Sequence, residues 1–107
     1  MTDKIAVLTT CATWMDAEKI ADAVLEPGLA ACVNILGGVG SRYRWKGAIE
    51  KSVEQMLIIK TRAPLFDRVR AAIESVHPYE LPEIVALPIA QGSPSYLNWI
   101  DEETSAR

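Results

Sequence analysis

The stretch that decides the fold runs from Ala30 to Thr61 and reads AACVNILGGVGSRYRWKGAIEKSVEQMLIIKT. Both of its ends are apolar and rich in β-branched residues, which is typical of strands. In its middle Tyr43 and Trp45 alternate with basic residues, a period of two that indicates extended chain. The Gly37-Gly38 pair interrupts the pattern, and glycines inside a strand often mark a bulge or bend. With Gly47 as the turn, the stretch predicts a long β-hairpin.

Strands and helices on both sides of the hairpin are predicted from hydrophobic spacing. Thr13, with Asp16 three residues later, has the pattern of a helix N-cap. His77-Pro78 ends a second helix, because the residue before a proline avoids helical backbone. The predicted elements are, in order, strand Ile5–Thr9, a helix to Leu25, strands Ala30–Leu36 and Val53–Thr61, a helix from Pro64 to Val76, strand Glu83–Ile89 and a short helix opened by Ser93-Pro94.

This order, β-α-β-β-α-β with one further helix, predicts an α+β ferredoxin-like fold with an antiparallel sheet. In that topology the first strand lies between the third and fourth strands, and the second strand forms the far edge. The first strand ends where the fourth begins, and the hairpin turns at the same end. We therefore expect Cys11, the loop His77–Glu80 and the region of Tyr43 and Trp45 to lie close together.

The predicted hairpin is longer than its neighbours, because the first and fourth strands have only about five to seven residues each. Its overhang would carry Tyr43, Trp45, Ile49 and Val53. Exposed strands with aromatic side chains tend to be paired or covered. Pairing between copies of the chain is the simplest cover, and a repeated contact of this kind closes into a ring, of which a trimer is the smallest. The alternative is that the hairpin folds back on its own domain.

Length and composition predict one domain over residues 1–107, since the chain has 107 residues and half are hydrophobic. The net charge of −3 argues against a nucleic-acid partner or an acidic membrane surface. No stretch approaches the ~20 apolar residues of a membrane span, and the start lacks the basic region of a signal peptide. We expect a cytoplasmic protein whose two cysteines are reduced.

Three residue types near the expected cluster could bind a transition metal. His77, Cys11 and Glu80 would supply imidazole, thiolate and carboxylate, a set that favours copper or zinc over magnesium. Each has a plainer interpretation. His77, the only histidine, could cap its helix; Cys11 could be a small core residue, although we expect it to be partly exposed; Glu80 could be a solvated surface charge.

A small-molecule pocket or an interface is the other possibility at this end of the sheet. The residues we assign to it are Tyr43, Trp45, Lys60, Tyr79 and Trp99. Glu50, Glu54, Glu80 and Glu83 are candidates for a carboxylate cluster, with surface charge as the alternative. The sequence has no nucleophile elbow, phosphate loop or dinucleotide fingerprint.

Several segments together resemble the CutA family of divalent-cation tolerance proteins. They cover nearly the whole chain and are GLAACVN from Gly28, SRYRWKG from Ser41, EQMLIIKT from Glu54, HPYELPE from His77 and YLNW from Tyr96. The resemblance implies a ferredoxin-like trimer joined through long hairpins, with a role in tolerance of copper and other divalent cations.

The resemblance also implies a copper site made from a cysteine at the end of the first strand and a histidine pair before Pro-Tyr. Here Thr9 stands at the cysteine position, with Cys11 two residues later, and Val76 replaces the first histidine. We therefore predict a homotrimeric, non-enzymatic protein that binds copper or another divalent cation. The alternative is a trimer similar to PII signalling proteins, which bind small effectors in clefts between subunits.

Overall fold

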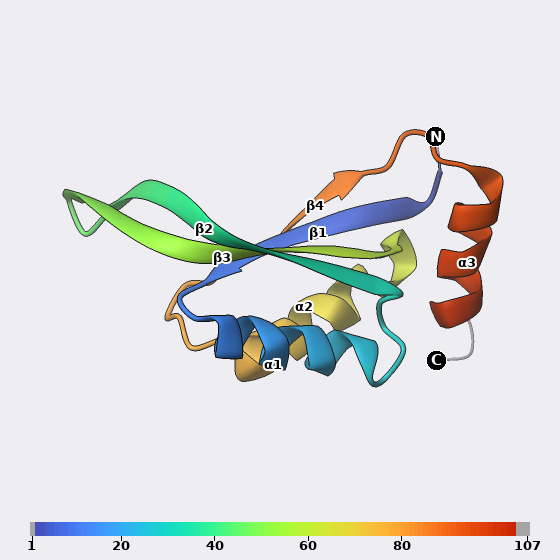
Figure 1. The fold of residues 1–107 in the computed structure, drawn as a ribbon, viewed down its shortest axis with the longest axis horizontal. Helices are drawn as coiled ribbons and strands as arrows, with labels where there is room; N and C mark the ends of the chain where they lie inside the picture. The colour runs from blue at the N-terminus through green and yellow to red at the C-terminus, as the bar shows by residue number, and fades with distance from the viewer. Residues whose placement is uncertain (1, 105–107) are drawn as a thin grey trace.

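A computed structural model describes residues 2–104; Met1 and residues 105–107 of the predicted domain lie outside the described residues. The elements follow the predicted order, β-α-β-β-α-β with a last helix (Figure 1). They are β1 (Lys4–Cys11), α1 (Trp14–Leu25), β2 (Cys32–Trp45), β3 (Ala48–Arg62), the 3-10 turn η1 (Ala63–Leu65), α2 (Phe66–Val76), β4 (Val85–Pro88) and α3 (Pro94–Thr104). All strand pairs are antiparallel, in the order β2-β3-β1-β4, so the ferredoxin-like prediction is confirmed.

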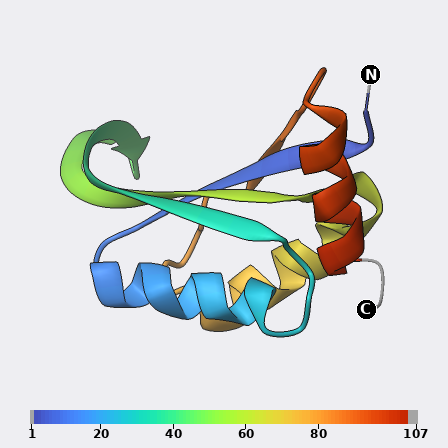
Figure 2. The ribbon, with the colours of Figure 1, turned by 45° about the vertical axis from the view of Figure 1, so that its right-hand side comes forward.

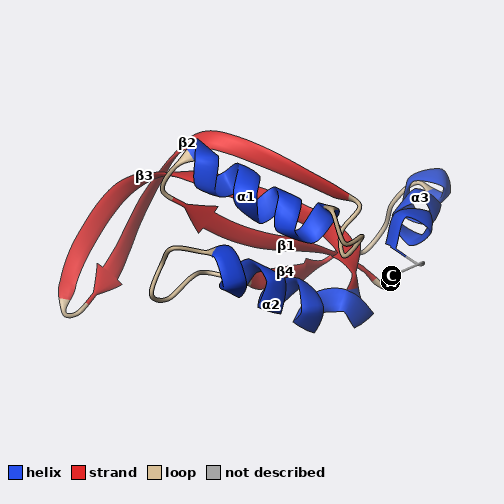
Figure 3. Cartoon of the chain, turned by 90° about the horizontal axis from the view of Figure 1, so that it is seen from below, coloured by secondary structure: helices blue, strands red, loops and turns tan. Residues whose placement is uncertain are grey.

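Helices α1 and α2 lie side by side on one face of the sheet, which we call the covered face (Figures 2 and 3). The side chain of Thr13 caps α1 by accepting a hydrogen bond from the Asp16 amide, 3.0 Å away. Apolar stripes on the two helices then pack on alternate residues of the strands. The fully buried contacts include Val7, Leu57 and Ile59 from the sheet and Ile20, Val24, Val69 and Ile73 from the helices.

The opposite side of the sheet, which we call the open face, is also apolar. Because side chains alternate along a strand and paired residues share a face, the pairing assigns its members. They are Lys4, Ala6, Leu8, Thr10, Cys32, Asn34, Leu36, Met56, Ile58, Lys60, Arg62, Val85 and Leu87. Leu36, Val85 and Leu87 are among the exposed large hydrophobic residues of the chain. The strand predicted over Glu83–Ile89 is shorter, because β4 pairs with only four residues of β1.

The hairpin of β2 and β3 extends far beyond the rest of the sheet, as predicted (Figure 1). Pairing with β1 ends at Cys11 opposite Gln55, so the following part of the hairpin is paired only with itself. It turns at Lys46 and Gly47, both with positive φ. The ladder has one irregularity between Leu36 and Val39, the bulge predicted from the glycine pair.

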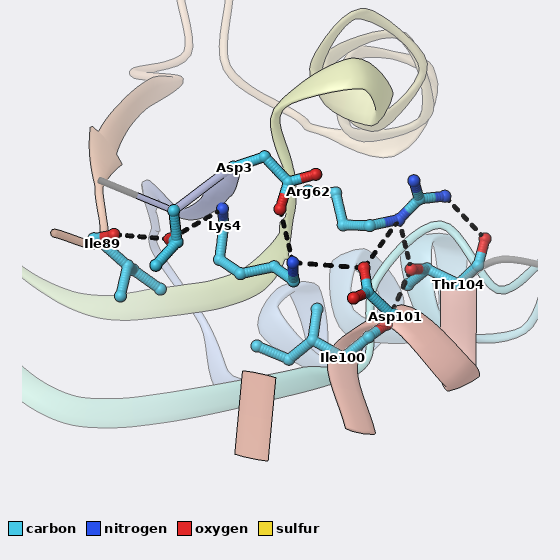
Figure 4. Close-up of polar contacts among 8 residues, drawn as sticks. Asp3, Lys4, Arg62, Ile89, Ile100, Asp101 and Thr104 are labelled. Carbon is cyan, nitrogen blue, oxygen red and sulfur yellow. Dashed lines mark hydrogen bonds and ion pairs between the residues drawn. The ribbon is translucent and has the colours of Figure 1, made fainter. Parts of the chain in front are cut away.

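Helix α3 packs at the other end of the sheet, far from the hairpin tip (Figure 1). There the ammonium group of Lys4 pairs with Asp3 and lies 3.2 Å from Asp101 (Figure 4). Arg62 donates a hydrogen bond of 2.8 Å to the buried Thr104 hydroxyl. Lys4 and Arg62 have the strand positions of the open face, so α3 covers the end of that face. None of the helices within residues 2–104 is long and apolar enough to cross a membrane.

Candidate functional site

A pocket of about 550 Å³ extends from the base of the hairpin, at Thr10 and Glu54, to Trp45 beside its turn, and is bordered by the loop that follows α2. This volume is typical of small-ligand sites. We call it the hairpin-base pocket, and it is lined by Thr10, Tyr43, Arg44, Trp45, Glu50, Ser52, Glu54, Pro78, Tyr79, Glu80, Leu81 and Glu83. Four carboxylates therefore face one guanidinium and three aromatic side chains. The prediction that the hairpin aromatics and the His77–Glu80 loop would meet is confirmed.

The bulge decides which hairpin side chains share this pocket. Met56 pairs with Leu36, and Glu54, two residues before Met56, pairs with Val39, three residues after Leu36. Between these two pairs β2 therefore contains one more residue than β3. From there on the odd-numbered residues of β2 share a face with the even-numbered residues of β3. Tyr43 thus pairs with Glu50, on the same face as Glu54.

Glu54 is the most buried acidic group of the pocket, with only 5% of its surface exposed. Its Oε2 atom accepts a hydrogen bond of 2.7 Å from the Tyr79 hydroxyl. Burial raises the pKa of Tyr79 well above its usual value, and the bond to Glu54 adds to the shift. Tyr79 therefore stays a hydrogen-bond donor throughout the physiological range. The other carboxylate oxygen, Oε1, has no hydrogen-bond partner within residues 2–104.

His77 lies beneath the pocket and is 9% exposed. Its Nε2 is 2.8 Å from the carbonyl oxygen of Thr10, and its Nδ1 accepts a bond of 3.1 Å from the Tyr79 amide. A carbonyl can only accept, so Nε2 carries the proton and the imidazole is neutral. The side chain thereby ties the end of β1 to the loop that carries Tyr79 and Glu80. Both ring nitrogens are engaged in this conformation.

Cys11 is fully buried on the covered face, so the expectation of partial exposure is wrong. The alternation of β1 points it toward the helices, where its thiol lies 3.5 Å from the carbonyl oxygen of Thr13. Burial raises the pKa of this thiol to about 11, and the carboxylates of Asp16 and Glu54 contribute. Metals bind the thiolate, so a protonated, buried Cys11 is a poor ligand.

The predicted metal ligands do not form a site within one chain. His77 has no free nitrogen, Cys11 is protonated, and Glu80 lines the pocket without either of them. No group of three or more His, Cys, Asp or Glu side chains within residues 2–104 is placed to hold a metal ion. A site of this composition does not fit the single chain as it stands.

The predicted pocket residues separate into two groups. Tyr43, Trp45 and Tyr79 line the hairpin-base pocket. Lys60 lies six residues from Glu54 along β3, about 20 Å away at 3.3 Å per residue, and its ammonium is 2.6 Å from the Asn34 side chain. Trp99 packs beside Tyr96 on α3. Neither lines the pocket, because Lys60 lies at the other end of β3 and Trp99 is on α3, which packs at the end of the sheet far from the hairpin tip (Figure 1).

Sequence reasoning missed Ser52 and Thr10 as pocket residues. The hydroxyl oxygen of Ser52 is buried and has no hydrogen-bond partner within the described residues. A signal was present in the sequence, because Glu50, Ser52 and Glu54 follow each other at the period of two that places strand residues on one face.

The fold and this pocket define a ferredoxin-like domain with an extended hairpin and an acidic, aromatic pocket at its base. Residues 5–103 match the family described as CutA1 divalent ion tolerance protein, and the chain belongs to that family. It is 45% identical over 98 residues to the divalent-cation tolerance protein CutA of Thermus thermophilus, which covers 92% of this chain and 95% of the relative.

Other relatives extend the comparison. The chain is 44% identical over 101 residues to Protein CutA of Mus musculus, covering 94% of this chain but only 57% of the mouse protein. The solved structure of CutA from Xylella fastidiosa superposes with a TM-score of 0.93 at 39% identity, over 96% of this chain and 99% of that one. A structure from Archaeoglobus fulgidus, described as a periplasmic divalent cation tolerance protein, has a TM-score of 0.91 at 40% identity, over 94% and 98%.

Proposed function

We propose that this chain acts in divalent-cation tolerance as a homotrimer that binds metal ions rather than catalysing a reaction. The observation that supports this most is the family match over residues 5–103, together with an apolar sheet face that the chain leaves open. The family description refers to tolerance of divalent ions and names no reaction.

The open face supports self-association. Leu36, Val85 and Leu87 are each about half exposed there, at 44%, 45% and 51%. Completing the burial of one large aliphatic side chain is worth up to about 1.5–3 kcal/mol, and a face with several such residues marks an interaction surface. A second copy offers the same apolar chemistry in return.

The sheet edges support a ring of copies. β2 and β4 are the two outer strands, so each leaves backbone groups unpaired within the chain. Pairing one edge with the other edge of the next copy is a contact between different surfaces, which closes into a ring by rotation. Three copies are the smallest such ring.

Light scattering after size-exclusion chromatography tests the assembly. We expect about three times the chain mass of 11.7 kDa for the wild type. Ile58→Glu places a charge in the open face and should reduce the mass to that of one chain. Met15→Glu is the matched control, because Met15 is exposed on α1, and it should keep the assembled mass. A wild-type mass of one chain would refute the trimer.

Cation binding is proposed for the assembled protein, because residues 2–104 of one chain do not bring three ligands together. Glu80 is the predicted ligand that stays available, and a second copy would supply the others. His77 and Cys11 contribute only if their present hydrogen bonds open.

Equilibrium dialysis against copper and zinc tests this arrangement. The wild type should bind, the dissociated Ile58→Glu variant should not, and Glu80→Gln should bind more weakly. Dialysis of the His77→Gln variant shows whether the imidazole takes part in binding the metal ion. Equal binding by the assembled wild type and the dissociated variant would contradict a shared site.

The pocket favours a second candidate, a trimeric signalling or scaffold protein that binds a small effector. Its volume is suitable, and its walls come from both the hairpin and the loop after α2. Four carboxylates there disfavour nucleotides and other anions, so an anionic effector of the PII type is not expected in this part of the molecule. A thermal-shift screen of nucleotides and small anions should show no stabilisation through the pocket.

We place the protein in the cytoplasm, in keeping with its two free cysteines. Fractionation of cells that produce the full-length protein, with a cytoplasmic and an exported marker, tests the compartment. Recovery with the exported marker would reject the assignment.

A further inference from the structure

We propose that the hairpin-base pocket binds a small organic ammonium ion with an apolar body, such as an arylalkylamine. This ligand class goes beyond metal tolerance and gives the effector candidate above a chemical identity. The pocket combines a buried carboxylate, aromatic walls and unpaired oxygen atoms, and this ligand satisfies all three.

The carboxylates supply the charge. Glu54 is 5% exposed and within residues 2–104 has a single hydrogen-bond partner, the Tyr79 hydroxyl. A buried carboxylate is costly unless charge and hydrogen bonds compensate it. Arg44 is the one cation that lines the pocket, against Glu50, Glu54, Glu80 and Glu83. An ammonium group beside Glu54 would balance the charge that the pocket leaves uncompensated.

The unpaired oxygens give the ammonium group a place to sit. Ser52 and Glu54 are two residues apart on β3 and share a face. The Ser52 hydroxyl oxygen is buried without a partner in the described part of the chain, and Oε1 of Glu54 makes no hydrogen bond there. An ammonium donates three hydrogen bonds and accepts none, so it can satisfy both oxygens together.

The aromatic rings favour an organic ion over a bare metal. An ammonium group within about 6 Å of an aromatic ring is attracted to its face. Trp45 already has the Lys46 ammonium 5.5 Å from its ring centroid, so Tyr43 and Tyr79 are the rings left for a ligand. Tyr79 is held in position by the contact with His77, whose ring centroid is 4.8 Å away. An aromatic ring face attracts an organic ammonium ion but offers no lone pair that could replace the hydration water of a metal ion.

Isothermal titration calorimetry of the assembled protein with phenethylamine tests the proposal. 2-Phenylethanol is the neutral isostere, 3-phenylpropionate the anionic analogue, and Mg²⁺ a cation without an apolar body. We expect binding of phenethylamine alone. Glu54→Gln keeps an acceptor for Tyr79 but removes the charge, and should weaken binding at least about tenfold. The control Glu18→Gln, an exposed carboxylate on α1, should leave binding unchanged.

Two further variants keep the test decisive if Glu54→Gln does not fold. Ser52→Ala removes a hydroxyl that has no protein partner, and should weaken binding about threefold. Tyr43→Leu removes a ring face and should have a similar effect. No heat with phenethylamine, equal binding of 2-phenylethanol, or Mg²⁺ binding with the same dependence on Glu54 would each overturn the proposal. None of these results alters the copper and zinc dialysis, so the metal function stands or falls separately.

Discussion

Ile58 and Ile59 are neighbours in β3, yet they belong to two different environments. Ile59 is fully buried beneath α1 and α2, whereas Ile58 is only partly buried on the open face. The same contrast separates Val7 from Leu8 in β1. Residue type does not explain the difference, because both faces are apolar.

The difference shows that the two faces are completed in different ways. The covered face is satisfied within one chain by two helices, while the open face has α3 at one end and otherwise keeps large apolar side chains exposed. Strands that are apolar on both faces are typical of sheets covered on both sides. In the trimer that we propose, the open face would therefore serve assembly, whereas the covered face serves folding.

The largest effect should come from the covered face. Ile59→Ala should lower the free energy of unfolding by about 2–5 kcal/mol, because it leaves a cavity among rigid neighbours. Urea denaturation measures the loss, and the assembled mass should not change. Ile58→Ala is the matched control, with a smaller loss of stability and a weaker assembly. Equal losses in the two variants would remove the distinction between the faces.

The next effect is a pH dependence carried by Cys11. Its pKa is about 9 in an unfolded chain and about 11 in the fold. Below pH 9 the thiol is protonated in both the folded and the unfolded state, so the free energy of unfolding does not depend on its titration. Between pH 9 and pH 11 only the folded state keeps the proton, and the free energy of unfolding falls as the pH rises. The loss should approach about 2–3 kcal/mol.

Urea denaturation between pH 8 and pH 11 measures this slope. Cys11→Ala should flatten it between pH 9 and 10, and Cys32→Ala should not. A decline above pH 10 should persist in Cys11→Ala, because the pKa of Tyr79 is also raised by folding. An unchanged slope in Cys11→Ala would show that the thiol is not responsible.

The docking of α3 on the end of the open face should have a moderate effect. Thr104→Val removes the acceptor for Arg62 and the hydroxyl that donates to the Ile100 carbonyl, 2.7 Å away. We expect a loss of about 1–2 kcal/mol and faster hydrogen exchange in α3. Ser75→Ala, which removes an exposed hydroxyl on α2, should cost much less. Unchanged exchange in Thr104→Val would indicate that apolar packing alone holds α3.

The smallest effect should come from the solvent side of α2, away from both faces. Arg70 and Glu74 form an exposed ion pair of 2.9 Å one helical turn apart. Glu74→Gln should cost no more than about 0.5 kcal/mol, and less in high salt. Urea denaturation at two salt concentrations measures it. A loss above 1 kcal/mol would mean that the pair supports the packing of α2 on the sheet.

The fold could be predicted from the sequence because the residues that start and end its elements agreed with the expected topology. Thr13, Gly47 and His77-Pro78 each marked the start or end of an element where the structure has it. β4 was predicted too long, since hydrophobic spacing does not reveal how many residues find a pairing partner.

Only part of the candidate site could be predicted from the sequence. Topology correctly brought the hairpin aromatics to the His77–Glu80 loop, but the place of Cys11 at the end of a strand suggested partial exposure, and this residue is fully buried. Which face a strand-end residue joins depends on the alternation of the whole strand, and a shift of one residue reverses it. The hydrogen bonds that occupy both nitrogens of His77 come from distant backbone groups, which no local pattern predicts.

The bulge in β2 makes the hairpin more tolerant of losing a residue than of changing one. Gly37 and Gly38 both lie opposite Gln55, so removing Gly38 would leave Leu36 opposite Met56 and Val39 opposite Glu54. Every side chain beyond the deletion would keep its face. A β-branched residue at Gly38, whose φ is +73°, would instead resist the backbone that the extra residue needs. If the ladder then slipped by one residue, Arg42 and Arg44 would take the places of Tyr43 and Trp45, and the pocket would exchange two aromatic side chains for guanidinium groups that pair with its carboxylates.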